Sequence, residues 1–233
     1  PRQRGTTRSV EEQSTLWGAF DPHKVYWEQV GLKVDPGKAQ YVLNLIDSFY
    51  SEIDMPDGVS LALDAVWYHP EGYESTHYIT FSGSLEGITE LRKLRSGDKY
   101  DKYNAEIASF CSITTIQSGA TLARWNTNKG ADPISQLWQF NVSDPGAFLN
   151  EFMKMEKAFP QEGYLSIGLI SQGASADGEN HYVYTTHKDY GTALSWGPKT
   201  QKAQSAFLTF QKNTGAYANY LGTVTLNRVK VWN

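Results

Sequence analysis

The feature that most constrains this chain of 233 residues is an internal duplication. Residues 76–80 (THYIT) resemble residues 180–184 (NHYVY), so that a His-Tyr pair recurs after 104 residues. Residues 121–124 (TLAR) resemble residues 225–228 (TLNR) at the same spacing. Repetition at one fixed spacing indicates a structural unit that occurs twice. We therefore expect two copies of one unit, in which matching positions are equivalent.

Both halves begin with the same succession of a strand and a helix. Residues 27–34 (WEQVGLKV) and 137–142 (LWQFNV) are rich in residues that favour strands. Each run is followed by Asp-Pro-Gly, which predicts a helix start with Asp as the N-cap and Pro at the first helical position. The two Asp-Pro-Gly segments, 35–37 and 144–146, lie 109 residues apart. We assign this difference in spacing to the connection after the first helix, where insertions are tolerated.

The rest of each half predicts two more strands, a broken helical stretch and a closing strand. The resulting order is βαββαβ, twice, which is the ferredoxin-like motif. In the first half we expect a second strand at 60–68, the His-Tyr strand, helices at 85–94 and 99–110, and a closing strand at 119–125. In the second half we expect a second strand at 164–171, the His-Tyr strand, helices at 190–196 and 199–211, and a closing strand at 222–232.

A ferredoxin-like sheet carries helices on one face only, so its other face must be covered. Two such sheets in one chain can cover each other. In this topology the chain resembles the dimeric α/β-barrel superfamily, which includes antibiotic-monooxygenase-like, stress-responsive and chlorite-dismutase-like proteins. The resemblance spans residues 25–232 and implies an α+β fold of two tandem ferredoxin-like repeats packed as a pseudo-dimeric α/β barrel. The expected divisions are an N-terminal arm at 1–22, repeats at 23–125 and 134–233, and a linker at 126–133.

Composition argues against several classes of partner. The net charge of −4 and the pI near 5.8 lack the basic footprint of nucleic-acid binding. No apolar run approaches the ~20 residues of a membrane-spanning helix. The single cysteine, Cys111, excludes an internal disulfide framework and is expected as a small, partly buried side chain in a helix or at a helix end. We expect a cytoplasmic protein, although a chain that begins at Pro1 also fits a cleaved signal peptide.

The paired histidines His77 and His181 are the most suggestive candidates for chemistry. Because the repeat pairs them, both could point into a shared cavity and act as a base, a hydrogen-bond donor or a metal ligand. Alternatively, each begins a strand and satisfies local hydrogen bonds there. Each shares one side of its strand with apolar residues, and that side would then face the helices.

Three tyrosines lie on the opposite side of the same two strands. Tyr78, Tyr182 and Tyr184 could line a pocket with an apolar body and a polar tip, or they could simply pack in the core. Trp67 is weighed in the same way. Its counterpart is Ser171, a difference that would let one cavity keep a role that the other lost.

Two arginines stand near the ends of the closing strands. The matched segments TLAR and TLNR place Arg124 and Arg228 at equivalent points. As a pair they could clamp an anionic ligand such as a carboxylate. The competing interpretation is that each is a solvated residue at a strand end.

Recognised catalytic and cofactor motifs are absent from the sequence. His181 and His187 lie six residues apart with acids nearby, but this spacing matches no known metal motif, and neither a metal nor a cofactor is predicted. The chlorite-dismutase-like branch of the resemblance implies a haem alternative, with His181 or His187 as the candidate axial ligand.

Three functions remain open at this stage. The first is a small-molecule-binding protein or cofactor-independent enzyme of the dimeric α/β-barrel type, which takes a small apolar or aromatic ligand. The second is a structural or assembly protein without catalytic activity, in which the arm at 1–22 contacts other copies in a homo-oligomer. The third is a haem-binding enzyme of chlorite-dismutase-like architecture. An aromatic share of 13 % favours the first, because it suffices both to build a core and to line a cavity.

Overall fold

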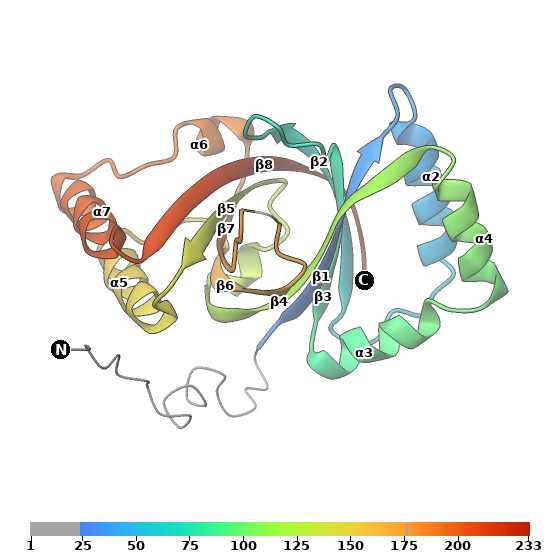
Figure 1. The fold of residues 1–233 in the computed structure, drawn as a ribbon, viewed down its shortest axis with the longest axis horizontal. Coiled ribbons are helices and arrows are strands. Elements are labelled where there is room, and N and C mark those ends of the chain that lie inside the picture. Colours follow the sequence, from blue (N-terminus) through green and yellow to red (C-terminus); the bar gives the residue numbers. More distant parts are fainter. Residues whose placement is uncertain (1–23, 176) are drawn as a thin grey trace, which may run out of the picture.

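A closed barrel of eight strands forms the centre of the molecule (Figure 1). The computed structural model describes residues 24–175 and 177–233, so the predicted arm at 1–22 lies outside the described residues. Around the barrel the strands follow the order β1-β3-β2-β8-β5-β7-β6-β4. The neighbouring strands are antiparallel throughout. Each repeat supplies one half of this ring, and the two sheets close on each other.

The elements follow the order βαββαβ in each repeat, with the second helical stretch divided in two. The predicted α+β fold of two tandem ferredoxin-like repeats in a pseudo-dimeric barrel is therefore confirmed. The elements are β1 (Tyr26–Val34), α2 (Ala39–Tyr50), β2 (Ser60–Tyr68), β3 (His77–Gly83), α3 (Leu85–Leu94), α4 (Asp98–Ile107), β4 (Cys111–Trp125), the 3-10 turn η1 (Thr127–Lys129), β5 (Ile134–Val142), α5 (Pro145–Ala158), β6 (Leu165–Gln172), β7 (His181–His187), α6 (Tyr190–Leu194), α7 (Gln201–Thr214) and β8 (Ala218–Trp232).

The two Asp-Pro-Gly segments behave differently, and the prediction was wrong for the first. Asp144 is the N-cap of α5, where its side chain accepts a hydrogen bond from the Ala147 backbone N–H at 3.1 Å. In the first repeat the corresponding segment forms a turn with Gly37 at φ 76°, and α2 begins only at Ala39. A residue in this left-handed region cannot continue a right-handed helix.

The closing strands are longer than predicted, and β4 starts at Cys111. The expected helical position of this cysteine was therefore wrong. Its thiol lies 3.4 Å from the Ile107 carbonyl oxygen at the end of α4, and its side chain is half-buried as predicted. Burial and the nearby Asp35 carboxylate raise the pKa of the thiol, which keeps it protonated and unreactive at neutral pH.

The register of the barrel corrects the alignment of the closing strands. Trp125 at the end of β4 pairs with Leu165, and Trp232 at the end of β8 pairs with Leu61. The closing strands are therefore related by 107 residues, whereas β2 and β3 relate to β6 and β7 by 104. A second change in length thus lies between the His-Tyr strand and the closing strand.

Helices cover the outside of the barrel on two opposite sides (Figure 1). On one side α2, α3 and α4 pack against the first sheet, and on the other α5 and α7 pack against the second. The strand ends are exchanged: Trp125 packs into the second core, with its ring 5.9 Å from that of Phe152, and Trp232 packs into the first core. Among the described residues, none of the helices has the length and apolar character needed to cross a bilayer.

Candidate functional site

Each sheet has one face toward the barrel lumen and one face toward the helices; cavities lie in the lumen and on the helix face of the second sheet. In the second repeat a cavity of about 420 Å³ lies between the sheet and the helices α5 and α7. A second cavity, of about 410 Å³, lies inside the barrel between the two sheets. Both volumes fall in the range of small-molecule sites.

Aromatic side chains form a large part of the wall of the helix-side cavity. Trp196, after α6, lies with its ring 4.7 Å from that of Trp138 on β5, and its indole Nε1 donates to Gln161 Oε1 at 2.5 Å. Phe152 on α5 meets Phe210 on α7 edge to face at 5.9 Å. The floor is formed by the β7 residues Val183 and Thr185; the remaining lining includes Phe140, Met155, Glu156, Phe159, Leu165, Phe207, Gln211, Thr214, Gly215, Ala218 and Tyr220.

The equivalent space in the first repeat is filled with side chains. The ladders place Phe81 on β3 where Thr185 stands on β7. The Phe81 ring packs against Tyr50 at 5.7 Å, and the Arg95 guanidinium lies 4.3 Å above it. Arg95 is held there by an ion pair with Glu28 at 3.0 Å. One large aromatic residue and one buried cation thus occupy the volume that the second repeat leaves open.

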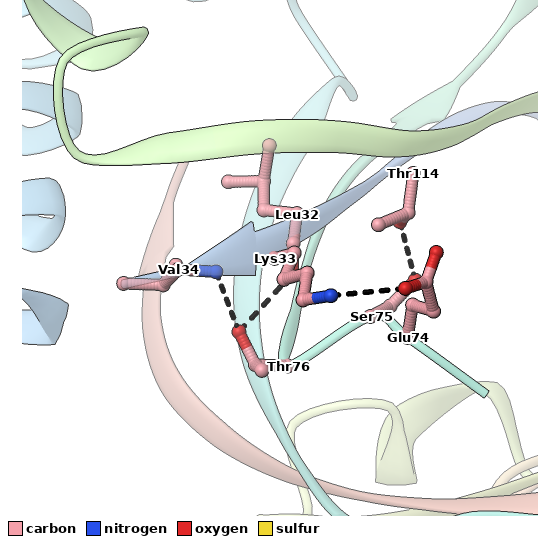
Figure 2. A network of polar contacts seen from close by, with 7 residues as sticks. All are labelled: Leu32, Lys33, Val34, Glu74, Ser75, Thr76 and Thr114. Carbon is pink, nitrogen blue, oxygen red and sulfur yellow. Dashed lines mark hydrogen bonds and ion pairs between the residues drawn. The ribbon is translucent and has the colours of Figure 1, made fainter. Parts of the chain in front are cut away.

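The paired histidines are equivalent, as predicted, but they do not share a cavity. His77 and His181 begin β3 and β7 and face the helices on opposite sides of the barrel. In the first repeat the Thr76 hydroxyl accepts from the Val34 backbone N–H at 2.9 Å and donates to the Leu32 carbonyl at 3.1 Å (Figure 2). The same hydroxyl lies 3.0 Å from His77 Nδ1. The histidine therefore belongs to the network that fixes the start of its strand.

The second repeat reproduces this arrangement with an amide. Asn180 accepts from the Val142 backbone N–H at 2.8 Å, donates to the Val142 carbonyl at 2.9 Å, and contacts His181 Nδ1 at 2.8 Å. His181 is only 1 % exposed and packs edge-on against Phe148. Burial lowers the pKa of His181 to about 4, so its imidazole is neutral at physiological pH. The interpretation as local strand-end residues is the one that the contacts support.

Four of the five tyrosines and arginines that were predicted as pocket residues lie in one cavity, and Tyr78 does not. Tyr182, Tyr184, Arg124 and Arg228 all line the lumen cavity. Tyr78 also lies on the lumen side, but it is buried against Val224 and Leu226 and is not part of the lining.

Trp67 lies away from both cavities. Its side chain is 45 % exposed on the outer surface, where it meets Tyr190 edge-on at 5.8 Å. The difference between the repeats that does lie at a cavity is the one between Phe81 and Thr185.

The predicted equivalence of the two arginines was wrong. In the barrel, Arg228 on β8 pairs with Asp64 on β2, and the related pair on the other side is Thr121 on β4 with Gly168 on β6. The likeness of TLAR and TLNR is a coincidence of residue type, because hydrogen bonding to the neighbouring strands sets the register. Arg124 and Arg228 nevertheless border one cavity.

Glu156 contributes the carboxyl group of the helix-side cavity. It lies on α5 among the aromatic residues of the lining. Burial raises its pKa, because the apolar surroundings disfavour the carboxylate. A carboxyl group with a raised pKa beside an apolar cavity is suited to accept and return a proton.

Comparison with known proteins places the fold. No family model and no curated relative matches the sequence. Solved structures do match: a candidate monooxygenase from Fusobacterium nucleatum subsp. nucleatum has 14 % identity and a TM-score of 0.58, with 90 % of this chain and 94 % of that chain covered. An anthrone oxidase-like protein has 12 % identity and a TM-score of 0.58, with 91 % and 93 % covered.

A haem-binding protein from Thermus thermophilus has 7 % identity and a TM-score of 0.53, with 89 % of this chain and 93 % of that chain covered. These structures have the same overall fold as this chain, an α/β barrel built from two ferredoxin-like units. At these identities the likeness is one of architecture. A function for this chain therefore has to be argued from its own residues.

The haem alternative can be tested against the donors around the helix-side cavity. Haem iron is held by His, Cys, Met or Tyr side chains; among the described residues, the lining contains Met155 and Tyr220 but no His or Cys. The buried His181 Nε2 has no hydrogen-bond partner within the described chain, but His181 lies outside the lining. His187 Nε2 is engaged by Thr185 Oγ1 and Gln136 Oε1, each at 3.1 Å. The histidine ligands that the resemblance implied thus do not fit this cavity.

Sequence reasoning missed the residues that define the helix-side cavity. Trp138 and Trp196 were weighed, like Trp67, as either pocket or core residues, and neither Phe207 nor Thr185 was singled out. The available signal was the aligned pair Phe81 and Thr185. At this position a large residue in one repeat corresponds to a small residue in the other. Only the fixed offset of 104 in the His-Tyr strands makes that comparison possible.

Proposed function

We propose that this protein binds a small aromatic molecule in the helix-side cavity of the second repeat. The observation that carries the proposal is the exchange of Phe81 for Thr185 at equivalent positions. This exchange, with no counterpart of the stacked Arg95 in the lining, opens about 420 Å³ between aromatic walls. Planar rings are favoured there, because offset and edge-on contacts between aromatic rings add to the burial of apolar surface.

The solved structures with the same fold support this ligand class. They include candidate monooxygenases and an anthrone oxidase-like protein, and anthrone is a fused-ring aromatic compound. Gln161, Thr185 and Gln211 supply a few polar groups in an otherwise apolar lining, which is the usual composition of a specific small-molecule site.

Glu156 extends the proposal from binding to cofactor-independent catalysis. A ligand with an acidic phenol or an enolisable carbonyl would present a proton to this carboxyl group. In that case Glu156→Gln would retain ligand binding and abolish turnover, since the amide keeps the size but cannot accept the proton.

The binding test uses 2-naphthol titrated into the protein by isothermal calorimetry. We expect saturable binding at one site, and we expect Thr185→Phe to weaken it at least tenfold by copying the residue of the first repeat. Thr209→Phe, on the exposed face of α7, is the matched control and should bind like the parent. Equal affinity in Thr185→Phe, with the fold verified by circular dichroism, would contradict the proposal.

Adding haemin to the same proteins distinguishes haem binding from binding of a small aromatic molecule. A sharpened and shifted Soret band in the parent protein, lost in Thr185→Phe, would show that the cavity holds haem and would replace the aromatic ligand proposed here.

A further inference from the structure

The barrel lumen contains a polar cluster that the helix-side cavity does not use. Arg228 Nε donates to Asp64 Oδ1 at 2.5 Å, and Arg228 Nη2 donates to the Tyr184 hydroxyl at 3.2 Å. The side chains of Arg228 and Asp64 are 16 % and 4 % exposed. All three residues line the lumen cavity of about 410 Å³. A charged pair is thus held inside the barrel, beside open volume.

The barrel itself shows that its fold does not require this pair. The pseudo-twofold counterpart of Asp64 and Arg228 is the neutral pair Gly168 and Thr121. At Gly168 the Tyr182 ring takes the space, since an added Cβ would meet Tyr182 atoms at 2.5 Å. Buried ion pairs are commonly no more stabilising than neutral residues of the same size. Because the same ladder position closes without charge across the barrel, Asp64 and Arg228 need another explanation.

The charges of the lining favour an anion. Arg124 brings a second guanidinium to the lumen cavity, while Asp64 is the carboxylate side chain of the lining. Tyr164 lies near Arg124, which partly offsets the rise in the Tyr164 pKa caused by burial. The contacts of Arg228 with Asp64 and Tyr184 use two of its five N–H donors, which leaves donors for a ligand.

Apolar surface surrounds these polar groups. Leu137, Ile170 and Leu226 line the same cavity, together with Trp27. The Trp27 ring meets Tyr182 edge-on at 5.4 Å, and its buried indole Nε1 has no hydrogen-bond partner within the described residues. The lumen lining therefore contains both guanidinium groups and ring surfaces.

We propose that the barrel lumen is a second ligand site, which binds a small aromatic carboxylate through Arg228 and Arg124. Asp64 and Tyr184 act as positioning residues that hold the Arg228 guanidinium toward the cavity. Two planar donors facing a carboxylate give charge-assisted hydrogen bonds, which are about twice as strong as neutral ones. The site lies on the lumen face of the sheet, so it is independent of the function proposed for the helix-side cavity.

Sodium benzoate is the probe, titrated by calorimetry at constant ionic strength, with benzamide as its neutral isostere and inorganic phosphate as a competing anion. We expect benzoate to bind saturably and at least tenfold more tightly than benzamide. Phosphate should bind more weakly than benzoate, because it has no ring to fill the apolar part. Absence of saturable benzoate binding, equal binding of benzamide, or tighter binding of phosphate would overturn the proposal.

Variants assign the binding to the lumen. Arg124→Gln and the double variant Asp64→Asn/Arg228→Gln remove charge while keeping side-chain size, and each should weaken benzoate binding at least tenfold. Arg92→Gln, at an exposed arginine on α3, is the matched control and should leave the affinity unchanged. If the double variant fails to fold, Arg124→Gln still decides the question. Benzoate affinity that survives in Arg124→Gln but is lost in Thr185→Phe would place benzoate in the helix-side cavity and refute a lumen site.

Discussion

The two repeats share one plan and solve the same packing problem in opposite ways. The first repeat fills the space between sheet and helices with Phe81, the buried Arg95 above it, and the rings of Tyr50 and Tyr103. The second repeat has Thr185 in place of Phe81 and keeps a cavity walled by aromatic side chains. Duplication thus leaves one half close-packed at this position, while the other half keeps an open cavity.

The largest effect on stability is expected from truncating Phe81, which fills the space between sheet and helices in the first repeat. Phe81→Ala should reduce the free energy of unfolding by about 3–5 kcal/mol, because it leaves a cavity in a close-packed core and exposes one face of Arg95. Thr185→Ala should cost only about 1 kcal/mol, mostly the hydrogen bond to His187. Urea denaturation of both variants measures the two values. Comparable losses would show that the second cavity is as tightly packed as the first core.

The buried histidine of the second repeat should make stability depend on pH. Because the pKa of His181 is lowered to about 4, the unfolded chain binds this proton below about pH 6.5, whereas the folded chain binds it only below about pH 4. The unfolding free energy should therefore fall as the pH drops from 6.5 to 4, by about 3 kcal/mol at most from this group.

The control for this effect is the variant His181→Phe, which keeps a ring against Phe148 but cannot titrate. Urea denaturation at pH 7 and pH 4.5 should show a smaller difference in this variant than in the parent. His77→Phe should change the difference less, because His77 is only half-buried. An equal pH dependence of stability in the parent and in His181→Phe would show that His181 is not the group responsible.

The smallest effect on stability is expected at the N-termini of α2 and α5, the first helix of each repeat. Asp144→Ala should cost about 1 kcal/mol, because the Asp144 carboxylate caps α5 at the Ala147 N–H. Asp35→Ala should cost less, because α2 begins at Ala39 with Lys38 at its N-cap position and no capping side chain. Thermal unfolding of the two variants compares them directly. Equal losses would mean that Asp35 stabilises the chain by some means other than a cap.

Much of the fold could be predicted because it depends on local patterns. The strand at 60–68 and the helix at 85–94 were predicted with their observed limits, since alternation and a helical period are properties of the sequence itself. The closing strands were predicted too short. Their first halves, which begin at Cys111 and Ala218, are held as strands by pairing with β1 and β5.

The candidate sites were predictable only in part. Tyr182, Tyr184, Arg124 and Arg228 were proposed as pocket residues, and all four line the lumen cavity. Asp64 was not proposed, because a carboxylate in the middle of a strand has no distinctive neighbours in sequence. It becomes informative only beside Arg228, which lies 164 residues away.

The sequence by itself determined that the chain is a duplication, and that each half is a βαββαβ unit. Strand pairing decided which residues of the halves are equivalent: the match TLAR–TLNR suggested 104 residues, and the barrel register gives 107 for the closing strands. The reason is that hydrogen bonds and bulges between strands set the register, while similar residue types can recur a few positions away. The tertiary structure alone decided that one repeat is filled and the other open, because a cavity is a property of what surrounds a side chain.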